Sequence, residues 1–194
     1  MGIYSFSSAI AEIKYYQRYE MHVEALDIAT EVDKEALDVK ERITLYKLMA
    51  LSYRKIDCSD YALIYINKAI SLLQEEKSFY SPDDFKTDYG ILLMNKGVVF
   101  HSQSKNDSAI DCYSRAISLF ENMTIPNNNL LVNSYISIGE VYLDLEHYFR
   151  SLCYFRYAEE KMDNSQDIRW GYVHNKISEL EKLIQNDGEG RKND

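Results

Sequence analysis

The stretch that decides the fold is residues 93–116, which read LMNKGVVFHSQSKNDSAIDCYSRA. Its key positions are a large, a small and an aromatic residue, followed after a gap by an alanine, an aromatic residue and a second alanine. They are Leu93, Gly97, Phe100, Ala109, Tyr113 and Ala116. Intervals of three and four residues place side chains on one face of a helix. The stretch therefore predicts two amphipathic helices joined by a turn around residues 105–107.

The same pattern occurs twice more in the chain. The later copy is Tyr135, Ile138, Gly139, Tyr142, Ser151, Phe155 and Ala158, and the earlier copy is Tyr46, Met49, Ala50, Tyr53, Ala62, Ile66 and Ala69. The small residue of the first helix recurs at Ala50, Gly97 and Gly139, which gives repeat periods of 47 and 42. Such periods indicate helical repeats, in which each helix pair buries its apolar face by stacking on the next pair.

We expect an all-α domain over residues 1–185. Its repeats are predicted at residues 5–32, 34–77, 82–122 and 125–162, the first being degenerate. A capping helix is predicted over residues 165–185 because one apolar stripe runs along it. That stripe is Trp170, Val173, Ile177, Leu180 and Ile184. A coiled-coil seam for dimerisation is the alternative use of the stripe. Residues 186–194 are polar and are predicted to be a disordered tail.

These residues resemble the tetratricopeptide repeat (TPR) family. Gly97, Gly139 and Ala50 are small where the paired helices of that family come closest. The resemblance implies a right-handed superhelix, or solenoid, of antiparallel helix pairs, with about four repeats and the cap. The periods of 42 and 47 exceed the usual 34 and resemble those of bacterial regulatory TPR proteins. The glycine usual in the turn between the paired helices is replaced by Ser104 and Glu146.

The composition excludes several classes of function. The formal net charge of the 194 residues is −9, and basic residues are not clustered, which argues against a nucleic-acid partner. No apolar run is long enough to cross a membrane, so we expect no membrane partner. Glu12 and Lys14 interrupt the apolar core that a signal peptide needs. We therefore expect a cytoplasmic location, with a leader removed before Met1-Gly2 as the alternative.

The sequence contains no pattern typical of catalysis. It has no P-loop, no Gly-rich dinucleotide turn, no HExxH and no GxSxG. The four histidines are scattered, and the three cysteines lack CxxC spacing, which fits neither a zinc site nor a disulfide framework. We therefore expect no enzyme activity, no metal and no cofactor.

The resemblance implies a concave groove lined by the first helix of each repeat. The residues expected on this groove are Lys14, Arg18, Lys47, Leu51, Arg54, Lys55, Met94, Val98, His101, Asn133, Glu140 and Asp144. Along the chain, these residues change from basic through apolar to acidic. The basic residues carry a charge opposite to the negative net charge of the whole protein. We expect a protein- or peptide-binding scaffold that takes an acidic segment and is a monomer or weak homodimer. One alternative is a sensory domain that binds a small peptide and changes curvature. Another is that the groove charges pair with neighbouring acids and bind nothing.

Overall fold

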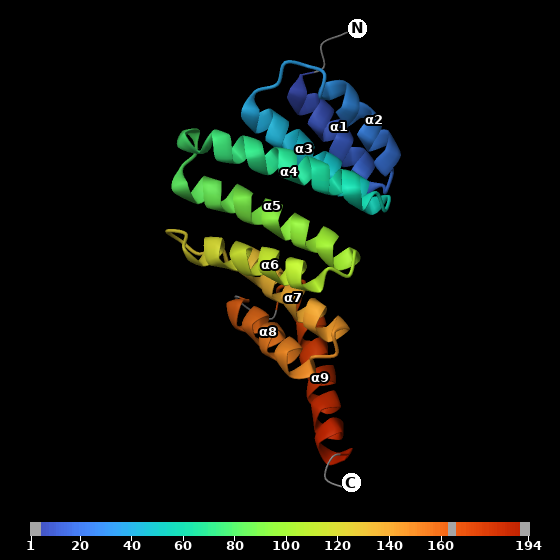
Figure 1. Cartoon of the computed structure of the whole chain (residues 1–194), viewed down its shortest axis with the longest axis vertical. Coiled ribbons are helices and arrows are strands. Elements are labelled where there is room, and N and C mark those ends of the chain that lie inside the picture. The colour runs from blue at the N-terminus through green and yellow to red at the C-terminus, as the bar shows by residue number, and fades with distance from the viewer. Residues whose placement is uncertain (1–4, 163–165, 191–194) are drawn as a thin grey trace. The chain divides into compact units, whose positions relative to one another are not determined.

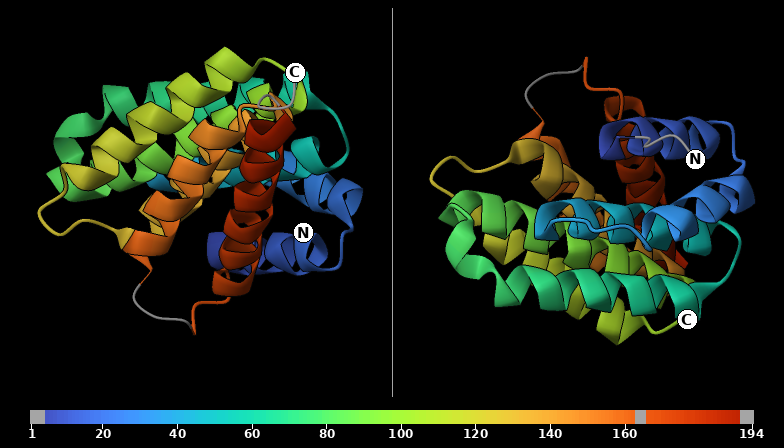
Figure 2. Two further views of the ribbon diagram at one scale, coloured as in Figure 1. Left: turned by 90° about the horizontal axis from the view of Figure 1, so that it is seen from below. Right: turned by 90° about the horizontal axis from the view of Figure 1, so that it is seen from above.

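The computed structural model describes residues 5–162 and 166–190. These residues form nine α-helices and one short 3₁₀ turn, and Figure 2 shows no strand among them. The first four helices are α1 (Phe6–Arg18), α2 (His22–Val32), α3 (Val39–Lys55) and α4 (Ser59–Glu75), and the 3₁₀ turn is Lys77–Phe79. The others are α5 (Pro82–Ser102), α6 (Asn106–Glu121), α7 (Asn128–Asp144), α8 (Tyr148–Lys161) and α9 (Trp170–Gly190). The all-α prediction of sequential helix pairs followed by a last helix is confirmed.

The chain divides into two compact units, Met1–Val99 and Phe100–Asp194, and the division falls inside α5. Within the first unit, Figure 1 shows the α1/α2 and α3/α4 pairs and then α5 beside α4, where Lys96 Nζ donates to Asn67 Oδ1 at 2.9 Å. Its core contains Ile13, Leu45 and Leu73, each at most 1% exposed. The core of the second unit contains the wholly buried rings of Phe120 and Phe155.

The last helix packs on α8, as a cap would. Val173 and Leu180 of α9 are at most 1% exposed, so the predicted apolar stripe faces the protein. The helix begins at Trp170 and continues through residues 186–190, where the sequence predicted the start of a tail. Ser165 and residues 191–194, which also belong to those predictions, lie outside the described residues.

The helices that open each pair (α1, α3, α5 and α7, called here the first helices) begin at a side-chain cap. Amides of the first turn need such partners because no helical carbonyl precedes them. Asp38 and Glu41 form a reciprocal capping box at α3. The other caps are Ser5, Ser81 and Asn127, each accepting a backbone N–H three residues later. The partner helices α2, α4, α6 and α8, called here the second helices, have no such side-chain bond.

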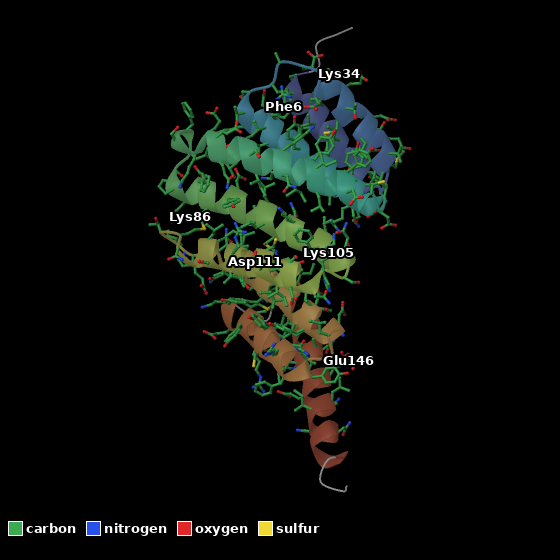
Figure 3. All side chains as sticks on the ribbon, in the orientation of Figure 1. Phe6, Lys34, Lys86, Lys105, Asp111 and Glu146 are labelled. Carbon is green, nitrogen blue, oxygen red and sulfur yellow. The ribbon has the colours of Figure 1, made fainter. Side chains whose placement is uncertain are left out.

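The second helices start instead from a left-handed turn that all four pairs share. One residue with φ between 57° and 59° separates the helices of each pair, and it is Glu20, Asp57, Ser104 or Glu146. Figure 3 labels Glu146 at the turn between α7 and α8. Two hydrogen bonds close each turn in the Schellman pattern. In the last pair, His147 N donates to Tyr142 O at 2.8 Å and Glu146 N donates to Leu143 O at 2.9 Å.

In all four turns, the acceptor of the hydrogen bond that spans five residues is the backbone carbonyl of an aromatic residue. The acceptors are Tyr16, Tyr53, Phe100 and Tyr142, at 2.8 to 2.9 Å. Five residues after the left-handed position comes a buried small residue, which is Ala25, Ala62, Ala109 or Ser151. Because these offsets are the same in all four pairs, the turn sets the register of the small and aromatic residues even where the repeat period changes.

Gly139 of α7 lies close to the ring of Phe155 of α8. A Cβ atom at this position would come within 3.0 to 3.3 Å of three ring carbons of Phe155, a wholly buried side chain. The carbonyl of Gly139 also accepts a hydrogen bond from Ser151 Oγ at 2.8 Å. The small residues that the sequence pattern singled out in this pair are therefore in direct contact with the opposite helix.

Replacing Glu146 by glycine should stabilise the protein. A left-handed conformation costs an ordinary L-residue roughly 1–2 kcal/mol, and glycine is free of this cost. We expect Glu146→Gly to raise the free energy of unfolding, measured in urea, by about 1 kcal/mol. Glu146→Ala is the control and should give no gain because alanine keeps the steric cost. An equal gain from both variants would contradict the left-handed assignment.

Gly139→Ala should destabilise the protein by about 1–2 kcal/mol because overpacking of a closed contact exceeds the helix-propensity gain of alanine. Gly171→Ala is the matched control, since a Cβ there would meet no atom within 4 Å. The control should be neutral or stabilising by up to ~1 kcal/mol. Thermal melts of both variants measure the difference. Equal melting temperatures would show that the ring of Phe155 moves aside freely.

Candidate functional site

Within the first unit, polar side chains connect successive first helices. Gln17 Nε2 of α1 donates to the carbonyl oxygen of Leu48 and to Ser52 Oγ of α3, both at 2.8 Å. Lys47 of α3 reaches Asp88 of α5, with 2.7 Å between Nζ and Oδ1. These bonds connect α1, α3 and α5, and each of these helices carries residues that the TPR resemblance predicted to bind a partner.

Two of the predicted basic site residues are neutralised by the chain itself. Lys47 and Asp88 are only 25% and 30% exposed and form a close ion pair. Lys55 lies 3.7 Å from Glu20 Oε1. The pKa of Glu20 is held below its ordinary value, first by a hydrogen bond from His22 and next by the charge of Lys55. The hypothesis that groove charges pair with neighbouring acids therefore describes Lys47 and Lys55.

Three other predicted cations remain available. Lys14, Arg18 and Arg54 have no ion-pair partner within the part of the chain that the structure describes. Lys14 and Arg18 are exposed, and Arg54 is half-buried. The predicted apolar residues of the same unit, Leu51, Met94 and Val98, are half-buried. The first helices of this unit thus combine uncompensated positive charge with partly accessible apolar side chains.

The predicted site residues of the second unit are engaged differently. His101 Nε2 lies 2.8 Å from Asp144 Oδ2, which joins the end of α5 to α7. Tyr172 of α9 donates its hydroxyl proton to Glu140 Oε1 at 2.9 Å. Burial, followed by the charge of Glu140, raises the pKa of Tyr172, so its hydroxyl stays protonated and remains a donor. Glu140 and Asp144 are therefore held by contacts within the unit.

Arg169, which comes just before α9, makes polar contacts with three other residues of this unit. Its guanidinium donates to Asn133 Oδ1 at 2.7 Å and to the carbonyl and side-chain oxygens of Asn129 at 3.0 and 2.8 Å. It also pairs with Asp167 and lowers the pKa of that carboxyl group to about 2. Asn133, predicted to bind a partner, is thus bound by the chain's own arginine.

Sequence reasoning missed Arg169 and Tyr172 as neighbours of the site. Their partners lie 32 to 40 residues earlier in the chain. The available signal was the capping-helix prediction itself, because a cap that covers the last pair has to contact side chains of that pair.

The structure offers no metal-binding arrangement among residues 5–162 and 166–190, since no three His, Cys, Asp or Glu side chains are grouped there suitably. None of the described helices has the length and apolar character needed to span a membrane.

Comparison with known proteins gives the fold of this chain. No family model matches the sequence, and no curated protein matches it. Among solved structures, the apo form of RapI matches with a TM-score of 0.77 and 14% identity over 93% of this chain. The match covers 49% of RapI, so the chain spans about half the length of that protein.

Two further matches cover more of the other protein. MamA has a TM-score of 0.58 and 21% identity, over 81% of this chain and 78% of MamA. TPR-like repeats from Podosopora anserina have a TM-score of 0.70 and 9% identity, over 96% of this chain and 90% of that one. Identities this low establish the fold alone. The chain has the all-α helical-repeat fold of tetratricopeptide repeat proteins.

Proposed function

We propose that this chain is a non-enzymatic interaction module that binds an acidic protein or peptide segment on the first helices of its N-terminal unit. The single observation that supports this most is the set of unpaired cations, Lys14, Arg18 and Arg54, on a protein of net charge −9. A local charge opposite to the global one steers a partner of complementary charge and orients it on arrival.

The apolar neighbours supply the second part of the proposed interface. Leu51, Met94 and Val98 are half-buried on α3 and α5, so a bound segment would remove their remaining surface from water. Charge selects and orients the segment, and apolar contact adds affinity. The segment best suited to this surface therefore alternates acidic and apolar side chains.

The site is centred on Arg18 and Arg54, and Lys47 is outside it. Lys47 is already paired with Asp88 at 2.7 Å, and an incoming carboxylate would have to compete with that pair. Breaking a partly buried pair leaves its other charge unsatisfied. We therefore place the acid-binding positions at the cations that the chain leaves uncompensated.

Charge reversal tests this proposal. The probe is a twelve-residue fluorescent peptide of alternating Glu and Leu, with a Lys-and-Leu peptide as the counter-probe, and binding is measured by fluorescence anisotropy. Arg18→Glu with Arg54→Glu should weaken binding of the acidic peptide by about tenfold or more and flatten its salt dependence.

The control reverses the same amount of charge elsewhere. Lys34→Glu with Arg115→Glu changes two cations that lie outside the first helices and form exposed pairs with Glu31 and Asp111. Its acidic-peptide affinity should stay within about twofold of the wild type, because exposed charges outside the contact surface are largely screened by salt. Equal losses in both double variants, or equal affinity for acidic and basic peptides, would refute the proposed site.

A further inference from the structure

Two of the helix pairs carry the same group of three tyrosines. In the first group, Tyr46 and Tyr53 precede the left-handed Asp57 and Tyr65 follows it. In the second group, Tyr135, Tyr142 and Tyr154 stand at the same offsets from the left-handed Glu146. In both groups the third ring packs against the other two, with centroids 5.4 Å apart twice in the first group and 6.4 and 5.6 Å apart in the second.

In the first group, the chain's own lysine occupies the surface of the rings. Lys68 follows Tyr65 by about one turn of α4. Its Nζ lies 4.8 Å from the ring centroid of Tyr65 and 5.5 Å from that of Tyr46. An ammonium group at these distances is attracted by the negative face of each ring. This arrangement of tyrosines therefore accommodates a cation.

In the second group, a further ring stands at the position of the lysine, and the guanidinium of Arg150 lies 5.5 Å from the centroid of the Tyr142 ring. Tyr157 follows Tyr154 at the same interval at which Lys68 follows Tyr65. Its centroid is 5.7 Å from that of Tyr135 and 5.9 Å from that of Tyr154. These three rings border a pocket of about 480 Å³ between α6 and α8. Tyr157 is 50% exposed, so the pocket opens to solvent.

The charged groups around the pocket favour a cation. Glu121 of α6 and Glu160 of α8 line it together with Lys161, which leaves one net negative charge. Glu121 accepts a hydrogen bond from the Tyr135 hydroxyl at 2.8 Å, and Lys161 Nζ lies 4.0 Å from Glu160 Oε1. Burial, and then the bond to Glu121, raise the pKa of Tyr135. Its hydroxyl therefore stays protonated at neutral pH and holds the Glu121 carboxylate at the pocket.

We propose that this pocket binds the cationic side chain of a lysine or arginine from a partner segment, in the way that Lys68 occupies the equivalent tyrosines of the first unit. Aromatic faces and carboxylates together match an ammonium or guanidinium group, since the rings attract the charge and the carboxylates accept its hydrogen bonds. The site lies on α6, α7 and α8 of the second unit. It is separate from the acid-binding residues proposed above and takes the opposite charge.

The test uses three small probes that share one backbone. They are the N-acetyl N-methylamides of arginine, lysine and norleucine, the last having the same linear stem without a charge. Each is titrated into the ¹⁵N-labelled full chain and followed by amide chemical shifts. We expect the arginine and lysine probes to shift residues 154–161 and 117–121 with saturation. The norleucine probe should bind at least ~5-fold more weakly.

Two variants distinguish probe binding in this pocket from nonspecific binding elsewhere on the protein. Tyr157→Lys gives the second group the cation that the first group already holds, so it should keep the fold and lose probe binding. Glu121→Gln with Glu160→Gln keeps the shape and should weaken the arginine probe about 5- to 10-fold. As a control, Tyr157→Phe keeps an aromatic face and should bind within about twofold of the wild type.

Several outcomes would overturn the proposal. Equal binding of norleucine and arginine probes would show that charge is irrelevant. A folded Tyr157→Lys chain, or the Gln double variant, with undiminished binding would show that the cation goes elsewhere. The variant Arg18→Glu with Arg54→Glu should leave these shifts unchanged, which keeps this result independent of the proposed acid-binding site.

Discussion

In every helix pair, the amide that follows the left-handed residue donates to the carbonyl of an aromatic residue five positions earlier, at 2.8 to 2.9 Å. This bond ends the first helix and starts the second within the same few residues. The first helices have side-chain caps, whereas the second helices have none, so the start of each second helix depends on this turn. The aromatic residue of the first helix and the buried small residue of the second then stand at constant offsets from the left-handed residue.

The turn also explains how helix pairs of different length keep the same register of small and aromatic residues. The left-handed residues are separated by 37, 47 and 42 positions, and the extra residues fall outside the turns. Each of these residues lacks the freedom of glycine, and each conformation costs roughly 1–2 kcal/mol. Packing a helix pair buries several large side chains at about 1.5–3 kcal/mol each, which outweighs that cost. The packing therefore tolerates Ser104 or Glu146 where glycine would be easier.

The positions that face the interior could be predicted from the sequence, and the polar surface could be predicted only in part. The TPR resemblance predicted a close approach of the paired helices at Gly139, and the helical spacing placed Ser151 and Phe155 on one face of the following helix. Ser104 and Glu146 were identified as the residues in place of the turn glycine, but their left-handed conformation could not be inferred from residue type.

Long-range charge pairing could not be inferred either. The partner of Lys47 is 41 residues away, and Arg169 binds residues up to 40 positions earlier. Each of these side chains could form an ion pair or hydrogen bond with several residues of the sequence, and the partner is determined only by the folded structure. The same limit applies to the tyrosine groups. The repeated residues are visible in the sequence, but their ring contacts arise from the packing of α3 with α4 and of α7 with α8, and the pocket beside Tyr157 arises from the packing of α6, α7 and α8.

A long-range HNCO experiment, which correlates an amide nitrogen with a carbonyl carbon across a hydrogen bond, would observe the turn bonds directly. We expect four such correlations, from Met21 to Tyr16, Cys58 to Tyr53, Lys105 to Phe100 and His147 to Tyr142. Their presence in all four pairs would establish the shared turn. If these amides instead correlate with the carbonyl four residues earlier, or show no correlation and exchange rapidly with solvent, the repeats do not share one register and the account is wrong.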